Sequence, residues 1–532
     1  MVGADGLKAA KNDKGLGILA GGRLSNEELF LVKQLAKEIG TENIDHSGGE
    51  CYKGVTEGLA ETLGVQASTG TFPQIEACDA ILAIRSDFYE THPVVGMVVN
   101  QAIRANHAEL MVIGDKKGKL DKLPGAETLL HAPGMEVNVL NAIAQVLIEE
   151  NLAVTDGVAG LDELKKQLSK YGADKVAKDT GVSEEAIRST ARKLAAAKKT
   201  AILLAYGLPY TANSKELGLA AANLAILCGN AGQEGCGLYL CGEKANSQGA
   251  IDLGILPGKG GLGAQAMLEA LAGGKLSGLY ILGEDPVSSY PNRAGVEAAL
   301  EKASFVVVQD LFLSPTAQQA DVVLPACSFA EKDGTFTNGE RRIQRLRAGI
   351  KSPGEAKTDR VILEKLLASL GAQVSYTGPA AIFSAIAGQV AGYAGINFDE
   401  IGPQGTVWGG ENLSLPKKQL VAVGGAKAIK GKHLLLTGSA LYHSGTLSTH
   451  AKGPLAVVAE SYIELGREDA QALKVAEGDL VTVKAANGEL KVKAKVGNRL
   501  PKGVVFVPYH FEQAGVNRIY QGEAAIAVEL KK

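Results

Sequence analysis

Cysteine is scarce in this chain of 532 residues, and the spacing of the few that occur excludes several classes of protein. There are six, at Cys51, Cys78, Cys228, Cys236, Cys241 and Cys327. Six cysteines in a chain of this length do not make the disulfide framework of a small secreted protein. No two of them form a C-x-x-C pair, so we expect no iron–sulfur cluster and no structural zinc site in this chain. A reducing, cytoplasmic setting is the natural expectation.

Apolar runs, basic runs and aromatic residues are also limited. The longest apolar stretch, residues 217–227, is too short to cross a bilayer, and residues 1–22 lack an apolar block with a cleavage site, so we expect no signal peptide. The net charge is −3, no run of Lys and Arg occurs, and aromatic residues make up 5% of the chain. These properties argue against nucleic acid as a partner. Any place at the inner face of a membrane would depend on partner proteins.

The residues that are present predict a large globular α/β protein. Apolar residues make up 46% of the chain, and its length allows roughly three or four domains. Strand-like runs alternate with helical periodicity, which is typical of parallel α/β layers. The predicted strands cover residues 17–20, 80–84, 110–113, 201–205, 278–282 and 305–308. The predicted helices cover residues 25–40, 138–151 and 184–198. In the first of these helices Ser25 and Glu28 fit a capping box, and Gly40 fits the C-terminal glycine.

The pattern changes in the C-terminal part of the chain. A segment rich in glycine and proline covers residues 402–432, and short strands with turn signals follow it at residues 434–436, 480–483, 490–496 and 504–507. This pattern predicts a separate, mainly β domain. We therefore expect an α/β region over residues 1–400, a linker over 401–432 and a β domain over 433–532.

The segment that covers residues 320–344 is the most specific in the chain. It reads A-D-V-V-L-P-A-C-S-F-A-E-K-D-G-T-F-T-N-G-E-R-R-I-Q. Residues 322–324 predict a short interior strand, and the dipeptide Asp333-Gly334 predicts a turn. Arg341 and Arg342 follow, and arginine forks suit phosphate and other planar anions. A solvated turn explains the same spacing, so these residues alone leave both interpretations open.

This segment resembles the molybdopterin oxidoreductase family, which includes formate dehydrogenases, nitrate reductases and the G subunit of NADH-quinone oxidoreductase. The segments Asn246-Ser247-Gln248-Gly249 and Gly242-Glu243-Lys244-Ala245 also resemble that family, and the second is closest to the G subunit. The resemblance implies two interleaved Rossmann-like α/β lobes and a C-terminal six-stranded β-barrel, without the N-terminal iron–sulfur domain of the family. The implied cofactor is molybdopterin guanine dinucleotide with molybdenum or tungsten.

The resemblance also implies the residues that contact this cofactor. An acidic residue at the carboxyl end of a strand can accept hydrogen bonds from ribose hydroxyls, which gives Asp115 a role beside the usual turn chemistry of such positions. The implied cofactor-binding residues are Ser86, Asp87, Asp115, Gly283, Glu284, Asp310, Thr437, Gly438 and Asn517. His443 and His510 lie in similar loops of the β domain, and for each an ordinary hydrogen-bonded loop residue is an equal alternative. The glycine-rich residues 258–263 lack the end of a phosphate-loop motif, so we expect a flexible loop there.

Two departures from the family concern the metal site. The resemblance places Cys51 in the position of the metal ligand, although a small buried thiol ahead of a helix is the simpler interpretation. The next residue is Tyr52 where formate dehydrogenases have histidine, and a phenol with a pKa of about 10 does not replace that histidine near neutral pH. Those enzymes also hold formate with an arginine, whose place falls at or beside Cys241 here. We therefore expect no formate oxidation by the usual route.

Two functions fit the sequence. One is an oxidoreductase chain that holds the cofactor and passes electrons to a separate iron–sulfur subunit in an NADH- or ferredoxin-linked complex. The other is a non-catalytic scaffold subunit with the same fold that has lost its metal, as in the G subunit of respiratory complex I. The substrate is not specified by the sequence.

Overall fold

The computed structural model describes residues 2–46, 52–85, 88–205, 213–443 and 445–532. These residues form two compact units, each built from two separate stretches of chain. Unit 1 contains Met1–Glu50 and Lys244–Gly410, and unit 2 contains Cys51–Glu243 and Glu411–Lys532. The chain therefore passes back and forth between the units, and the expectation of interleaved lobes is confirmed.

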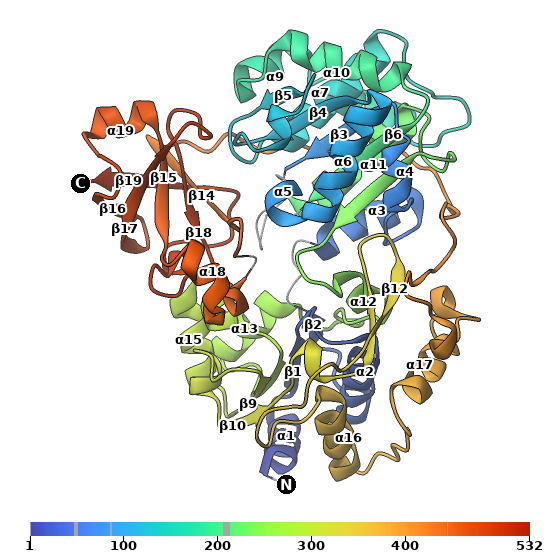
Figure 1. The fold of residues 1–532 in the computed structure, drawn as a ribbon, viewed down its shortest axis with the longest axis vertical. Helices are drawn as coiled ribbons and strands as arrows, with labels where there is room; N and C mark the ends of the chain where they lie inside the picture. The colour runs from blue at the N-terminus through green and yellow to red at the C-terminus, as the bar shows by residue number, and fades with distance from the viewer. Residues whose placement is uncertain (1, 47–51, 86–87, 206–212, 444) are drawn as a thin grey trace. The chain divides into compact units, whose positions relative to one another are not determined.

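Unit 1 is built around a five-stranded parallel sheet with the order β2-β1-β8-β9-β10 (Figure 1). The strands are β1 (Leu16–Ala20), β2 (Ile44–His46), β8 (Gly278–Leu282), β9 (Phe305–Asp310) and β10 (Val322–Pro325). The helices are α1 (Val2–Asp13), α2 (Asn26–Ile39), α12 (Ser247–Asp252), α13 (Ala264–Ala272), α14 (Pro286–Ser289), α15 (Arg293–Lys302), α16 (Asp359–Leu370) and α17 (Pro379–Ala387). Helices α1, α2, α16 and α17 share one apolar core against the sheet, and α13 packs on α15 on its other face (Figure 1).

Helix α2 begins and ends where local chemistry requires it. Ser25 Oγ accepts a hydrogen bond from the Glu28 backbone N–H (3.2 Å), and the Ser25 N–H donates to the Glu28 carboxylate (2.8 Å). The helix ends at Gly40, whose φ of 77° lies in the left-handed region that favours glycine. Both predicted caps are therefore present.

Two expectations for residues 320–344 are wrong. Strand β10 is the edge strand of the sheet and not an interior strand, and its side chains alternate between half-buried and exposed. Asp333-Gly334 is not a turn, because Gly334 begins β11 (Gly334–Thr337), which pairs antiparallel with β12 (Arg342–Leu346). The turn lies instead between these strands. The hairpin extends to a third strand, β13 (Thr406–Val407).

The α/β part of unit 2 contains a second five-stranded parallel sheet, with the order β5-β4-β3-β6-β7. The strands are β3 (Ala80–Ile84), β4 (Glu109–Gly114), β5 (Glu127–Leu130), β6 (Thr200–Ala205) and β7 (Gly237–Cys241). The helices are α3 (Gly54–Leu63), α4 (Phe72–Glu76), α5 (Phe88–Thr91), α6 (Pro93–Asn106), α7 (Glu136–Glu149), α8 (Leu161–Leu168), α9 (Ala173–Thr180), α10 (Glu184–Ala196) and α11 (Ser214–Leu227). Helices α4 and α6 share a core with one face of the sheet.

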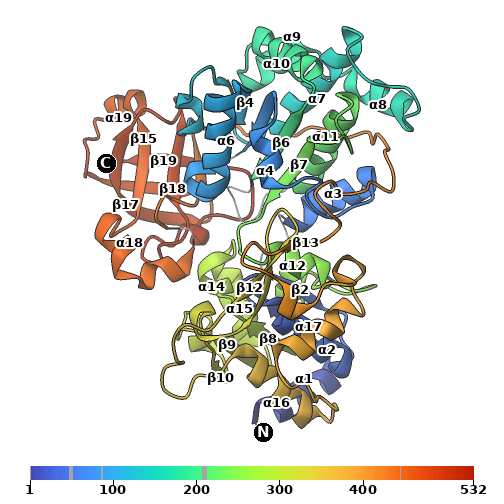
Figure 2. The same ribbon diagram turned by 45° about the vertical axis from the view of Figure 1, so that its right-hand side comes forward.

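The C-terminal part of unit 2 is a closed six-stranded barrel with the order β14-β18-β15-β17-β16-β19 (Figure 2). The strands are β14 (His433–Gly438), β15 (Tyr462–Gly466), β16 (Leu480–Ala485), β17 (Gly488–Gly497), β18 (Val504–Pro508) and β19 (Ile526–Lys531), with the short helices α18 (Lys452–Val457) and α19 (Arg467–Leu473). The expected β-barrel is confirmed. Four of its strands were predicted from the sequence, and β15 and β19 were not.

Residues 411–432, which precede the barrel, run along the α/β part of unit 2. The Leu413 N–H donates to the Thr69 carbonyl (2.9 Å), and the Asn223 side chain both donates to and accepts from the Val421 backbone. The segment is thus held by specific backbone contacts. None of the helices that the structure describes combines the length and the apolar character that a bilayer crossing requires.

Candidate functional site

The carboxyl edge of the unit 2 sheet is the first candidate site. In the order β5-β4-β3-β6-β7 the chain reverses its direction of winding between β3 and β6, and ligands of open α/β sheets bind at such a switch point. Arg85 follows β3, Asp115 follows β4 and His131 follows β5. Three polar side chains are thus presented along one edge by three neighbouring strands.

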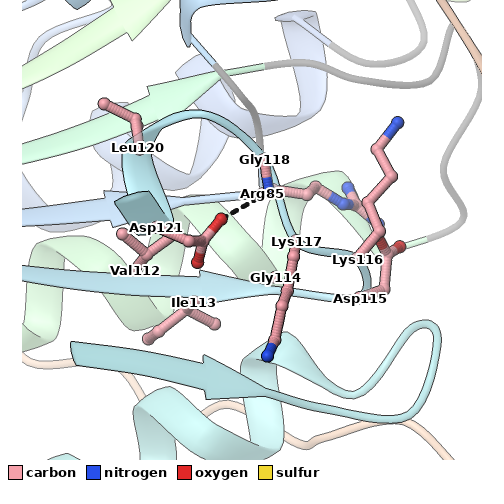
Figure 3. A pocket seen from close by; sticks show the side chains of 10 residues that line it. All are labelled: Arg85, Val112, Ile113, Gly114, Asp115, Lys116, Lys117, Gly118, Leu120 and Asp121. Atoms are coloured by element: carbon pink, nitrogen blue, oxygen red, sulfur yellow. Dashed lines mark hydrogen bonds between the residues drawn. The ribbon is translucent and has the colours of Figure 1, made fainter. Parts of the chain in front are cut away.

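A pocket opens at the end of β4 (Figure 3). Figure 3 shows Arg85, Asp115 and Lys116 among the residues that line it, with the Gly114–Gly118 backbone as one wall and the Lys116 ammonium extending away. The side chains that line it are those of Arg85, Val112, Ile113, Asp115, Lys116, Lys117, Leu120 and Asp121. Two carboxylates, of Asp115 and Asp121, beside three basic side chains suit a ligand that offers both hydroxyl groups and negative charge, such as a ribose with phosphate.

Arg85 is held at this edge in a strained conformation. Its φ of 74° lies in the left-handed region, which is uncommon for a residue with a side chain. Its N–H donates to the Ile113 carbonyl (2.8 Å), and its Nη2 lies 2.8 Å from Glu136 Oε1, where both side chains are buried. Burial alone would raise the pKa of Glu136, but the Arg85 guanidinium and the His131 ring outweigh it and hold that pKa below its usual value. The carboxylate is therefore ionised and paired with Arg85.

Lys116 connects the pocket to the barrel. Its Nζ lies 4.1 Å from the centre of the Phe506 ring on β18, a cation–π contact. Burial and the nearby Arg499 guanidinium lower the pKa of Lys116, while Glu90, Asp115 and Glu464 oppose the change. Arg499 itself is bound by Glu464 (2.6 Å) and Glu90 (2.6 Å). The guanidinium is thus neutralised by two carboxylates, and within the described part of the chain no hydrogen bond or ion pair occupies the Lys116 ammonium.

The residues expected in the β domain lie at the end of β14 and in a short 3₁₀ turn. Thr437 Oγ1 donates to the Val507 carbonyl (2.8 Å), and the Tyr509 N–H donates to the Gly438 carbonyl (3.1 Å). Asn517 lies buried in the short 3₁₀ turn Val516–Arg518. The His443 and His510 rings stack with their centres 5.0 Å apart. His443 Nε2 lies 2.8 Å from the Val458 carbonyl oxygen. In the described structure His443 is therefore a loop residue whose ring is hydrogen-bonded to the backbone.

Unit 1 has its own switch point, between β1 and β8. The Gly21 N–H donates to the Leu282 carbonyl (2.7 Å), and a methyl group added at Gly21 would lie 2.2 Å from the Gly283 carbonyl oxygen. Gly283 has a φ of 60°, in the left-handed region. Glycine is therefore needed on both sides of this contact, where two strand ends meet at the carboxyl edge.

Two buried carboxylates lie at the same edge of unit 1. Glu284 follows β8, and Asp310 is the last residue of β9. Burial raises the pKa of Asp310 to about 7, and Asp285 and Glu284 add to that effect, whereas the Leu311 N–H, at 2.7 Å, opposes it. A group with a pKa near neutral can serve as donor or acceptor toward a nucleobase or a ribose.

The residues predicted from the sequence fall into separate groups. Cys51, Ser86 and Asp87 lie outside the described residues. Asp115 lies at the unit 2 pocket, Gly283, Glu284 and Asp310 lie together at the unit 1 edge, and Thr437, Gly438 and Asn517 lie in the barrel. Glu136 and His131 were not anticipated, because nothing in the sequence links residue 136 to Arg85.

Other residues proposed from the sequence have structural roles. Arg341 is fully buried, and its Nη1 donates to the Trp408 and Gly410 carbonyls, the latter at 2.9 Å, while Arg342 binds Glu340 (2.6 Å). The suggestion that Arg341 is available for phosphate is therefore wrong, because its guanidinium lies in the core. Cys241 ends β7 as a core thiol, and burial raises its pKa to about 12.

The glycine-rich residues 258–263 are not the loose loop that the sequence suggested. The Gly258 N–H donates to the Glu42 carbonyl (3.0 Å), and the Leu262 N–H donates to the Asn43 side chain (2.9 Å). These bonds fix both ends of the segment. Among the described residues no group of three or more His, Cys, Asp or Glu side chains is arranged to hold a metal ion.

Comparisons with known proteins agree with this architecture. The family model described as molybdopterin oxidoreductase matches residues 4–369, and the model described as molydopterin dinucleotide binding domain matches residues 434–526. The F420-dependent formate dehydrogenase subunit alpha of Methanocaldococcus jannaschii is 32% identical, over 97% of this chain and 84% of that protein.

One further relative and one solved structure are also similar to this chain. A NADH-quinone oxidoreductase G subunit from Rhizobium meliloti is 30% identical, over 98% of this chain but 62% of its own length. The structure of acetylene hydratase from Pelobacter acetylenicus matches with a TM-score of 0.81 at 17% identity, over 99% of this chain and 88% of that one. At that identity the match supports the fold alone.

Proposed function

The chain belongs to the molybdopterin oxidoreductase family, and we propose that it is the cofactor-bearing subunit of a multisubunit oxidoreductase. In this proposal it holds molybdopterin guanine dinucleotide with molybdenum or tungsten. It passes electrons to a partner subunit that carries iron–sulfur clusters and is linked to NADH or ferredoxin. Relatives named as alpha or G subunits support a role within a complex.

The observation that carries the proposal is that the carboxyl edge of each of the two parallel sheets offers groups suited to a nucleotide. The unit 2 edge offers Asp115 for ribose hydroxyls, with Arg85 and Lys116 for phosphate. The unit 1 edge offers a glycine–glycine contact at Gly21 and Gly283 and the buried acid Asp310. The chemistry of both edges suits the nucleotide portion of such a cofactor. When bound, the cofactor would supply two-electron redox chemistry at its metal.

The remaining site residues belong to the proposal as well. We assign Thr437, Gly438 and Asn517 to the same cofactor through the barrel, together with Ser86, Asp87, Glu284 and the metal ligand Cys51. The domain limits 1–400, 401–432 and 433–532 are part of this assignment.

Formate is not expected to be the substrate by the usual route. Cys51 is followed by Tyr52, and the place of the formate-binding arginine falls at or beside the buried thiol Cys241. Formate-dependent dye reduction by the purified chain, abolished in Cys51→Ala, would contradict this expectation.

The experiment that tests the proposal is purification of the tagged chain from its own host, followed by native mass spectrometry and measurement of molybdenum and tungsten. We expect an iron–sulfur companion and metal in wild type, and no metal in Cys51→Ser. A companion without metal in either protein favours the alternative of a scaffold subunit that has lost its metal. A free chain with neither metal nor companion contradicts both functions.

A further inference from the structure

We propose that residues 427–432, the lysine segment, form the surface on which the iron–sulfur companion docks through exposed carboxylates of its own. The segment carries Lys427, Lys430 and Lys432 and leads directly into the barrel. This inference rests on the proposed function, which requires a companion but does not say where it binds. None of the three lysines is among the residues that the family resemblance assigned to the cofactor.

The first observation is the distribution of charge along the sequence. Glu411 and Glu460 are consecutive acidic residues, so residues 412–459 contain no carboxylate side chain. The same stretch contains six lysines, although the whole chain has a net charge of −3. The rest of the chain is therefore net acidic, and the lysine segment stands out from it. A surface of one sign attracts a partner of the opposite sign and sets its orientation.

The second observation is that the charges of the segment are not used within the chain. Lys427, Lys430 and Lys432 are all exposed. Within the described residues none of their ammonium groups forms an ion pair or a hydrogen bond. The buried Lys332, by contrast, binds two carboxylates at 2.7 and 2.8 Å. The three ammonium groups of the segment are thus available to carboxylates of another protein.

The third observation is that the backbone of the segment is fixed at both ends. Before it, the Asn138 side chain donates to the Ala426 carbonyl (3.1 Å) and accepts the Ala426 N–H (2.8 Å). In its middle, Ile429 packs against an apolar cluster that includes Phe506. After it, His433 begins β14. Lysines that only kept a chain soluble would not need such fixing, whereas a pre-organised surface loses less entropy when a partner binds.

The segment also borders the candidate site of unit 2. Phe506, from the cluster beneath Ile429, is the ring that the Lys116 ammonium contacts at 4.1 Å. A methyl group added at Gly134 would lie 4.0 Å from Ile429 Cδ1, and Gly134 follows β5 at the carboxyl edge of the sheet. A companion docked on the lysine segment would therefore lie beside the edge to which we assign the cofactor.

The carboxylates on neighbouring elements do not cancel this charge. Asp469 on α19 lies 3.8 Å from the His433 ring, but it is buried. Glu468 is exposed and lies 3.8 Å from Lys502, which adds a further cation at this end of the segment. Glu523, before β19, accepts a backbone N–H at 3.1 Å. Exposed cations thus outnumber exposed carboxylates around the segment.

Binding of the purified companion tests the assignment. The complex would be purified from its own host and separated in high salt, and the Kd and association rate would be measured by surface plasmon resonance at low and at physiological salt. We expect the triple variant Lys427→Glu, Lys430→Glu and Lys432→Glu to bind about tenfold or more weakly, mainly through slower association, and to lose less affinity when salt is added. The matched control reverses two exposed lysines earlier in the same acid-free stretch, Lys417→Glu and Lys418→Glu, and should bind within about twofold of wild type.

Cross-linking of the wild-type complex with a carbodiimide, which joins a lysine amine to a carboxylate, needs no variant. Peptide mass spectrometry should find links from the lysine segment to Asp or Glu of the companion. Wild-type affinity in the triple variant, equal weakening in the control, or links only from lysines elsewhere in the chain overturns this docking surface and leaves the proposed function intact.

Two further outcomes would also overturn the assignment. If the triple variant keeps its companion but loses binding to vesicles of anionic phospholipid that wild type shows, the segment belongs to a membrane surface. If the wild-type chain from its own host has no iron–sulfur companion, the proposed function itself is contradicted, and the docking surface falls with it.

Discussion

At the scale of single residues, Arg341 shows how a side chain that looks like a ligand can be part of the core. It is fully buried with a φ of 70°, its Nη1 donates to two backbone carbonyls, and its guanidinium lies 5.5 Å from the centre of the Trp408 ring. We expect Arg341→Lys to lower the free energy of unfolding by about 2–4 kcal/mol, because a lysine cannot serve both carbonyls and the ring.

Chemical denaturation measures this change, and Arg342→Lys is the control. Arg342 is half-buried and binds Glu340, so its replacement should cost about 0–1 kcal/mol. An Arg341→Lys protein of unchanged stability with weakened GDP binding would restore the phosphate role suggested by the sequence.

Two buried carboxylates make the stability of the chain depend on pH near neutrality. Burial raises the pKa of Glu27 to about 7, although the Thr335 N–H and hydroxyl oppose it, and burial raises the pKa of Asp252 to about 7. Both values lie above those of the unfolded chain, so the folded state binds more protons between about pH 4 and pH 7. The stability that these groups contribute is fully present at the acid end of that window and is lost as the pH rises through about 7.

The measurement is the free energy of unfolding of wild type and Glu27→Gln at pH 5, 6, 7 and 8. Because glutamine does not titrate, the decline with rising pH should be shallower in Glu27→Gln than in wild type. Parallel profiles for the two proteins would mean that Glu27 does not titrate in this range.

The residues of the candidate site were only partly predictable. Asp115 and Gly283 were singled out because acids and glycines at strand ends have a local chemical meaning, and their role in the site stays a prediction. Arg85 was not singled out as a site residue, and its partner Glu136, the first residue of α7, is 51 positions away in the sequence. Pairings of this kind are not encoded by any spacing in the sequence.

At the scale of elements, the contact of β1 with β8 is the most sensitive part of unit 1. We expect Gly21→Ala to destabilise the fold by about 1–3 kcal/mol, because its methyl group would lie 2.2 Å from the Gly283 carbonyl and must push two strand ends apart. Cofactor content should fall with it. Gly349→Ala is the matched control, since its added methyl group meets nothing within 4 Å.

Thermal unfolding and cofactor content would be measured for both variants. If Gly21→Ala and Gly349→Ala behave alike, the close approach of the two strand ends has no energetic importance.

A helix or strand was predicted correctly where neighbouring residues in the sequence determine it. The ends of α2 were predicted because a capping box and a left-handed glycine are set by neighbouring residues. Strand β10 was misplaced in the sheet because its apolar run matches an interior strand, and its edge position depends only on strand order. Strands β15 and β19 were missed because they are defined by pairings with segments that are distant in the sequence.

At the scale of the whole molecule, the two-unit arrangement followed from resemblance and not from pattern. Alternating strands and helices predict parallel sheets, but they do not say that residues 1–50 and 244–410 share one unit. The family resemblance predicted two interleaved lobes without their limits, and the structure supplies the limits. The role in electron transfer, by contrast, remains a proposal about a complex.

The measurement that bears most directly on the cofactor is the content of pterin and guanine nucleotide in the chain purified from its own host. After acid denaturation, fluorescence detects oxidised pterin, and mass spectrometry detects GMP released from the dinucleotide. We expect both in amounts stoichiometric with the chain, and reduced amounts in Asp115→Ala, which loses the carboxylate at the end of β4. Protein that carries neither pterin nor GMP would contradict the assignment of this chain as a cofactor-bearing subunit.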